Sequence, residues 1–171
     1  MTMPVRVAAA FVLAACAPTL DWREVRPEGG AVQAQFPCRP DSQVRRIALA
    51  GAAVNLSLHA CSAAQTTFAL AFADVEDPAR VAAALDELAN AAQRNIGATA
   101  GTASALRIEG MTPNPGARRL HLQGRLPDGQ AVQEQVALFT RGTRVYQVSM
   151  VGATLDAAAV ESFFGALRLP T

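Results

Sequence analysis

Residues 66–96, TTFALAFADVEDPARVAAALDELANAAQRNI, contain the change of hydrophobic period that decides the fold. At the start of this stretch the side chains of Phe68, Leu70 and Phe72 alternate with smaller ones, which predicts a strand with one buried face. From Val81 onward, apolar residues recur with the period of an amphipathic helix. The stretch therefore predicts a strand followed closely by a long helix.

The two ends of this helix carry residues that favour helix termini. Asp77 is a good N-cap, and Pro78 fits the first helical position, where its missing amide costs nothing. Gly97 fits the left-handed position after the last turn. We therefore expect the helix to extend from about residue 78 to residue 96.

The same alternation predicts three further strands before this stretch and three after it. They cover residues 31–36, 43–50, 54–59, 119–125, 131–140 and 144–151. Turns at Gly51, Asp128-Gly129 and Arg141-Gly142 connect neighbouring strands, and Thr154 or Asp156 caps a final helix that ends at Leu167. Four strands, a helix, three strands and a helix predict an α+β fold. We expect an antiparallel twisted sheet of about six to seven strands with two main helices packed on it.

Residues 98–117 are rich in Gly, Thr, Ser, Pro and Asn, so we expect mostly loop with a short extended piece at 105–108. A long loop in a compact domain is often functional, which makes 98–117 a candidate contact region. A disordered insertion is the alternative interpretation.

The start of the chain resembles the leader of a bacterial lipoprotein. Arg6 precedes a short apolar segment that ends in Leu13-Ala14-Ala15-Cys16, which is similar to a lipobox. The resemblance implies a signal peptide at 1–15 and acylation of Cys16, with a short tether at 16–30 and a single α+β domain at 31–171. A segment this short is not expected to span a bilayer as a helix. The alternatives are a secretory signal cut by the general peptidase, or a cytoplasmic protein with an apolar start.

The residue after Cys16 bears on the membrane to which the chain is sorted. Ala17 occupies a position where lipoproteins of the inner membrane often carry Asp, so the resemblance favours the outer membrane. We therefore expect a lipid-anchored protein of the cell envelope that faces the periplasm.

The cysteine count agrees with an exported protein. With Cys16 acylated, Cys38 and Cys61 remain as a single pair in a compartment where disulfides persist. A disulfide between them is the expectation, and two reduced buried thiols are the alternative. A metal pair is less favoured, because no clustered His or Cys completes a tetrahedral site.

The charges argue against a nucleic-acid partner. The chain has 15 basic and 14 acidic residues, and all of the basic ones are Arg. The doublets Arg45-Arg46 and Arg118-Arg119 are too few and too far apart in the sequence to form a basic surface of the usual kind.

Two short apolar signatures and the order of elements carry a resemblance to a known fold. Phe36-Pro37-Cys38-Arg39-Pro40 closes the first predicted strand, and Phe163-Phe164-Gly165-Ala166-Leu167-Arg168-Leu169 lies near the end of the sequence. Together with the long helix after the fourth strand, they resemble the PsbP-like α/β sandwich and, within it, the DcrB-type envelope lipoproteins. The Cys38/Cys61 pair is not part of that general pattern. Members of this fold serve unrelated tasks, so the resemblance implies a fold and no catalytic residues.

Few residues of the sequence suggest catalysis or metal binding. His59, Ser57 and His121 lie in predicted strands, and we expect them on the solvent face, without the convergence that a nucleophile site needs. Asp74, Glu76 and Asp77 precede the helix, where carboxylates complement its dipole. Neither a cofactor nor a metal ion is predicted.

A lone Trp22 lies in the tether, where it could rest at the membrane interface, although we favour packing at an exposed edge of the core. The sequence thus favours a non-enzymatic module that docks another periplasmic or membrane component through a surface it does not identify. One alternative is a carrier of a small apolar ligand or lipid, with a pocket lined by Phe68, Phe72, Phe139 and Phe163. A second is a periplasmic hydrolase that uses His59 or His121. The sequence does not indicate an oligomeric state.

Overall fold

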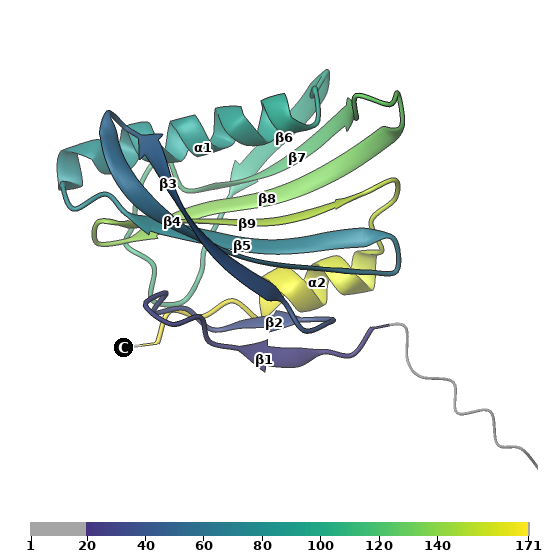
Figure 1. Cartoon of the computed structure of the whole chain (residues 1–171), viewed down its shortest axis with the longest axis horizontal. Helices are drawn as coiled ribbons and strands as arrows, with labels where there is room; N and C mark the ends of the chain where they lie inside the picture. The colour runs from purple at the N-terminus through teal and green to yellow at the C-terminus, as the bar shows by residue number, and fades with distance from the viewer. Residues whose placement is uncertain (1–19, 171) are drawn as a thin grey trace, which may run out of the picture.

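Seven antiparallel strands form the main sheet of the computed structural model, which describes residues 20–170. The strands are β3 (Asp41–Leu49), β4 (Ala52–Ala63), β5 (Thr66–Asp74), β6 (Ala100–Ala105), β7 (Arg118–Arg125), β8 (Ala131–Arg141) and β9 (Arg144–Gly152). They lie in the order β3-β4-β5-β9-β8-β7-β6 (Figure 1). Because β5 pairs with β9, the sheet joins the N-terminal and C-terminal halves of the chain. The predicted α+β class and the antiparallel sheet with two helices are confirmed.

Helix α1 (Val81–Asn95) covers one face of this sheet (Figure 1). It follows a single 3-10 turn, η1 (Pro78–Arg80), in which the Asp77 carboxylate accepts the N–H of Ala79 at 2.9 Å. Gly97 has a φ of +52°, the left-handed conformation expected after the last turn. Both predicted ends are confirmed, with the first turn in 3-10 form.

Helix α2 (Ala157–Gly165) and a small two-stranded sheet cover the opposite face. The small sheet pairs β1 (Arg23–Val25) with β2 (Ala34–Phe36). Asp156 caps α2, because its carboxylate accepts the N–H of Ala159 at 2.8 Å. The hydroxyl of buried Tyr146 donates to the carbonyl of Gly30 at 2.8 Å, which ties the turn before β2 to the main sheet. The main sheet is therefore the middle of three layers.

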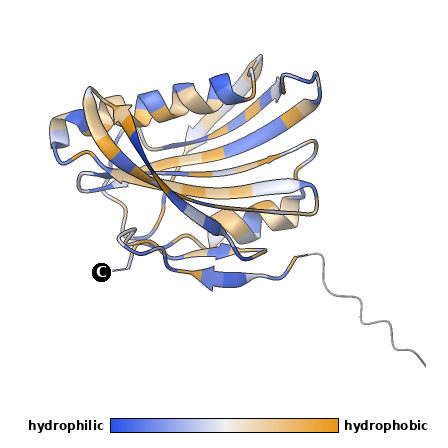
Figure 2. Ribbon diagram, in the orientation of Figure 1, coloured by the Kyte–Doolittle hydropathy of each residue, from blue (hydrophilic) through white to orange (hydrophobic). Residues whose placement is uncertain are grey.

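Each face of the main sheet has its own apolar core, because successive side chains along a strand point to opposite faces. The core under α1 is aliphatic and includes Leu85, Val136 and Leu138. The core under α2 is largely aromatic and includes Phe36, Phe68, Phe139 and Phe163 among others. Figure 2 shows hydrophobic residues along the central strands between the two helical layers. The central strands are therefore covered on both sides.

Three elements differ from their predicted extent. Residues 100–105, predicted as loop, form β6, because backbone pairing with β7 does not require the apolar alternation that this segment lacks. The predicted strand at 31–36 is shortened to β2, and it pairs outside the main sheet with β1, which lies in the segment expected to be the tether. Helix α2 ends at Gly165 rather than at Leu167.

A disulfide and the helix lengths complete the fold. Cys38, just before β3, is bonded to Cys61 of β4, with their Cα atoms 6.1 Å apart, as predicted. Within residues 20–170, no helix is long and apolar enough to cross a membrane. The predicted acylation site, Cys16, lies outside the described residues, as does the signal peptide at 1–15.

Candidate functional site

His59 lies on β4 beside an aromatic ring, away from any nucleophile arrangement. Its imidazole stacks on Phe72 with ring centroids 6.1 Å apart, on the α2 side of the sheet, and is half-buried. Burial lowers the pKa of His59 and so disfavours its charged form. Ser57 lies two residues earlier on the same side, opposite Phe72, and the serine directly across from His59 is the exposed Ser42 of β3. The expectation that His59 faces solvent is wrong, and the geometry gives it a packing role.

His121 is exposed on β7 and cannot join His59 in one site. Three strands lie between β4 and β7 in the sheet, which separates the two residues by roughly 19 Å at the usual strand spacing. The cross-strand neighbours of His121 are Thr102 and Gln135, so no carboxylate is paired with it across the sheet. A hydrolase built on either histidine has no support in this arrangement.

The acidic residues before α1 have local structural partners. Asp74 accepts the hydroxyl of Thr143 at 2.7 Å and lies 3.6 Å from Arg144. The hydrogen bond from Thr143 is the main reason that the pKa of Asp74 is lowered. Asp77 caps η1. No cluster of three or more potential metal ligands occurs among residues 20–170.

The aromatic residues considered for a ligand pocket pack against one another. Phe68 and Phe163 have ring centroids 5.2 Å apart in an edge-to-face arrangement, and Phe139 stacks on Tyr146 at 4.8 Å. Phe139 and Phe163 have no exposed surface. Trp22 adds an edge-to-face contact with Phe68 at 6.1 Å, so it packs at the margin of this core. The rings fill the space that an apolar ligand would need.

A buried carboxylate that the sequence analysis did not single out lies on the opposite face. Glu134 of β8 is 4% exposed, and its Oε2 has no hydrogen-bond partner in the described part of the chain. Its cross-strand neighbours are Leu122 and Val151, both apolar. Burial raises the pKa of Glu134 to about 7. A signal was present in the sequence, because Glu134 has the same strand parity as Val132, Val136 and Leu138, which were predicted to point inward.

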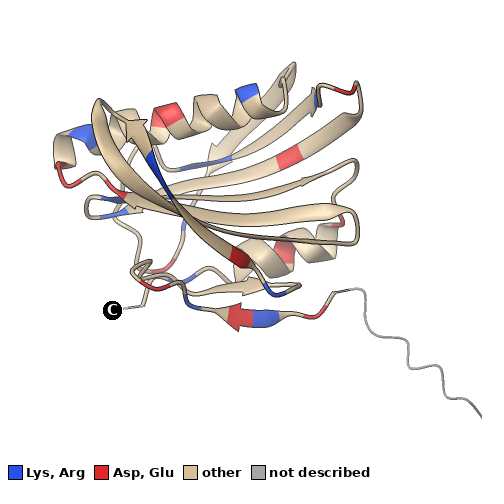
Figure 3. Cartoon of the chain, in the orientation of Figure 1, with Lys and Arg blue, Asp and Glu red and all other residues tan. Residues whose placement is uncertain are grey.

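The outer edge of β6 is the feature of the fold that most resembles a binding surface. β6 is the last strand of the main sheet, and every residue in it is exposed. Its sequence, AGTASA, contains neither a charged residue nor proline (Figure 3). The other edge strand, β3, carries Asp41, Arg45 and Arg46. Charged residues on an edge strand discourage pairing with another chain, so β3 is protected in a way that β6 is not.

The hydrogen bonds of β7 define which groups of β6 face outward. Arg125 of β7 donates its N–H to the carbonyl of Ile96, and the carbonyl of Gln123 accepts the N–H of Thr99. The backbone groups of Arg125 and Gln123 therefore point toward the β6 side. Because these groups alternate in direction along a strand, the other odd-numbered residues of β7 do the same. They pair with even-numbered residues of β6. The N–H and C=O groups of the odd-numbered residues of β6 therefore point away from the sheet.

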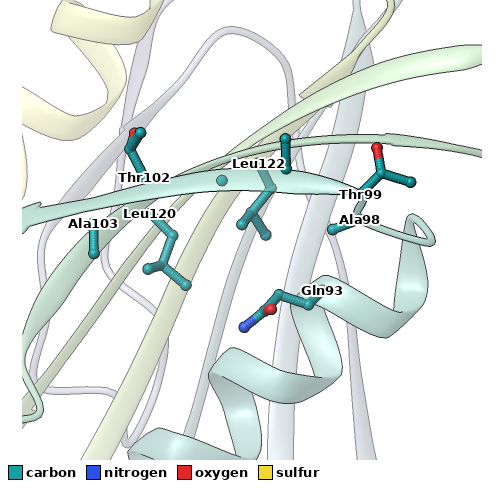
Figure 4. Close-up of a pocket in the computed structure, with 9 residues that line it drawn as sticks. Gln93, Ala98, Thr99, Thr102, Ala103, Leu120 and Leu122 are labelled. Carbon is teal, nitrogen blue, oxygen red and sulfur yellow. The ribbon is translucent and has the colours of Figure 1, made fainter.

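A groove of about 310 Å³ lies beside this edge, between the end of α1 and strands β6 and β7 (Figure 4). Leu120 and Leu122 form its apolar floor, and the side chain of Gln93 extends into it from α1. Gly101 keeps the groove open, because a Cβ there would lie 2.7 Å from Cδ2 of Leu122. Thr102 points to the other face of the strand (Figure 4). Residues 98–103 of its lining belong to the candidate contact region at 98–117, whereas Gln93, Leu120 and Leu122 lie outside that region.

Comparison with protein-family models and with curated proteins found no match for the chain.

Proposed function

We propose that the chain is a non-enzymatic, lipid-anchored envelope protein that docks another periplasmic or membrane component, with the outer edge of β6 as its contact surface. The observation that carries the proposal is an exposed, uncharged edge strand beside a groove with two leucines on its floor. Such an edge can form backbone hydrogen bonds with another chain.

The anchor in this proposal is supported by the motif at Leu13–Cys16 and by the Cys38–Cys61 disulfide, which suits an oxidising compartment. Asp21 donates its N–H to the carbonyl of Pro37 and Trp22 packs against Phe68, so the folded part begins no later than Asp21. Ala17 favours the outer membrane, with the folded part facing the periplasm. The three-layer arrangement supports a PsbP-like α/β sandwich of the DcrB type, which we include in the proposal.

The two alternative functions have weaker support. A carrier would need an interior cavity, whereas the aromatic rings under α2 fill that region. A hydrolase would need His59 or His121 beside a serine and a carboxylate. Cross-strand pairing places Ser42 opposite His59, but it places no carboxylate opposite either histidine. Docking requires no titratable cluster.

Labelling and crosslinking test the two parts of this proposal. Cells grown with a labelled fatty acid should yield labelled protein, and Cys16→Ala should abolish the label. In-cell crosslinking of the anchored protein should recover one protein partner reproducibly. Unlabelled, unprocessed protein in the cytosol would contradict the anchor. A co-purified lipid without a protein partner would support the carrier instead.

A further inference from the structure

The free edge of β6 is suited to one kind of occupant. The backbone groups of Gly101, Ala103 and Ala105 point outward, and their side-chain positions lie on the α1 face, beside the groove. A strand added at this edge would place every second side chain on that same face, because cross-strand neighbours share a face. Those side chains would lie against the opening of the groove.

The floor of the groove determines which side chains of an added strand would fit against it. Leu120 and Leu122 line the floor of the groove and are largely buried, with exposed fractions of 6% and 4%, so a small part of each apolar side chain reaches the groove. The residues of β6 on this face are Gly101, Ala103 and Ala105, which occupy little of the groove. Filling it requires apolar side chains larger than alanine at alternate positions of the added strand.

A second copy of this chain does not meet that requirement. Self-pairing of β6 about a two-fold axis at Ala103 would place Gly101, Ala103 and Ala105 of the second copy opposite the same three residues. Their small side chains would leave the groove largely empty. The nearby charges oppose self-pairing as well, since Arg107 of one copy would approach the end of the strand where Arg125 of the other copy lies.

The same arginines favour a partner with acidic residues. Arg107 and Arg125 are exposed near opposite ends of β6. Arg125 donates to the carbonyl of Gly129 at 3.0 Å, and neither arginine forms an ion pair within residues 20–170. Arg118, by contrast, pairs with Asp86 at 2.9 Å. Carboxylates that flank an extended segment would meet these two cations at the rim.

We infer that the edge of β6 accepts an extended segment of a protein partner as an added strand, with alternating apolar side chains in the groove and acidic residues at its ends. This inference rests on the proposed docking function and specifies the chemistry of the partner. Affinity comes from the outward backbone groups and selectivity from the groove.

A synthetic peptide tests this inference with the full chain purified in detergent. The probe is acetyl-ETLTVTLTE-amide, and the control peptide has Asp in place of Leu and Val. The amide resonances of Gly101, Ala103 and Ala105 should shift on titration with the probe, and the control should bind at least about tenfold more weakly.

Two variants at one position separate strand pairing from general adhesion. Ala103→Pro removes an outward N–H that the fold does not use and should abolish probe binding. Ala103→Ser keeps that N–H and should bind like the wild type, and the melting temperature of each variant reports its folding. Binding to folded Ala103→Pro at wild-type affinity, or no binding to the wild type at roughly 1 mM probe, would overturn the inference. If the probe peptide does not bind but Cys16 is still labelled by fatty acid, the edge site is refuted and the proposed lipid anchor is not.

Discussion

At the scale of single residues, Glu134 has the most unusual surroundings. The register surrounds it with apolar side chains on the α1 face, and the charged residues of α1, Asp86, Glu87 and Arg94, lie on the exposed side of that helix. Arg118 of β7, on this face, pairs with Asp86 of α1. No cation therefore compensates for the burial of Glu134, and its carboxyl group is more easily kept neutral than charged.

This environment makes the stability of the protein depend on pH. The pKa of Glu134 is about 7 in the folded chain against an ordinary value of 4.5, so the folded state binds the proton more tightly. The carboxyl group is protonated in both states below about pH 4.5, and its cost to folding grows as pH rises to about 7 and then stays constant. Glu134→Gln should therefore gain about 2–3 kcal/mol relative to the wild type between pH 5 and pH 8. Urea unfolding at both pH values measures this difference.

An exposed glutamate provides the control for this measurement. Glu28 is exposed in the turn before β2, and Glu28→Gln should change the free energy of unfolding by no more than about 0.5 kcal/mol. An equal free-energy difference between wild type and Glu134→Gln at pH 5 and pH 8 would show that the carboxyl group is solvated or paired in solution.

The site residues were predictable to very different degrees. Cys38 and Cys61 could be paired from the sequence because, with Cys16 assigned to acylation, they are the two cysteines that remain. Glu134 could have been placed inward from strand parity, but its polarity argued for the solvent face, and only the register shows that both neighbours are apolar. The edge of β6 was not predictable, because Ala, Gly, Ser and Thr carry no periodic signal and the strand exists through pairing with β7.

At the scale of elements, the contact of α1 with β7 depends on Gly124. A Cβ at this position would lie 2.1 Å from the carbonyl oxygen of Ile96, which also accepts the N–H of Arg125. Gly124→Ala should push the end of α1 away from the sheet and lower the free energy of unfolding by about 1–3 kcal/mol. Chemical denaturation followed by circular dichroism measures the loss.

A second glycine is a matched control for this variant. Gly165 is the last residue of α2, and a Cβ there would have no heavy atom within 4 Å. Gly165→Ala should raise stability by up to about 1 kcal/mol through helix propensity. If both variants lost stability equally, the close approach of α1 to Gly124 would not be the cause.

The disulfide holds the edge hairpin of β3 and β4 to the segment that follows β2. It closes a loop of 23 residues in sequence separation, so its removal should cost about 3 kcal/mol. We expect the double variant Cys38→Ala/Cys61→Ala to unfold at correspondingly lower denaturant concentration. A reducing agent should produce the same shift in the wild type and none in the double variant. A reducing agent without effect on the wild type would mean that the two thiols are not bonded.

Elements with strong periodicity were predicted well, and short ones were not. Apolar spacing predicts the helix at 81–95, strands β4 and β5, and strands β7 to β9. Turn residues support these predictions, since Gly129 and Gly142 have φ values of +86° and +59°. β1 and β2 have three residues each, too few for alternation to identify their partner. Their pairing over α2 is a tertiary contact that local sequence does not encode.

At the scale of the whole molecule, the two cores share the strands between them. Val136 and Leu138 of β8 face α1, while Ala137 and Phe139 of the same strand face α2. Loosening one layer therefore disturbs strands that form the wall of the other core. This sharing favours one cooperative unfolding transition rather than separate melting of two layers.

The only tryptophan of the chain can report on this coupling. Trp22 packs against Phe68 on the α2 side, whereas Leu85 of α1 is fully buried on the opposite side of the sheet. Leu85→Ala should destabilise the α1 core by about 2–5 kcal/mol. If the layers are coupled, Trp22 fluorescence and far-ultraviolet circular dichroism should shift together to lower denaturant concentration. Val44→Ala, at a side chain that is 66% exposed on β3, should move neither signal by more than about 0.5 kcal/mol. A Trp22 transition that stays in place while circular dichroism shifts would show that the layers unfold independently and that the shared strands do not transmit the loss.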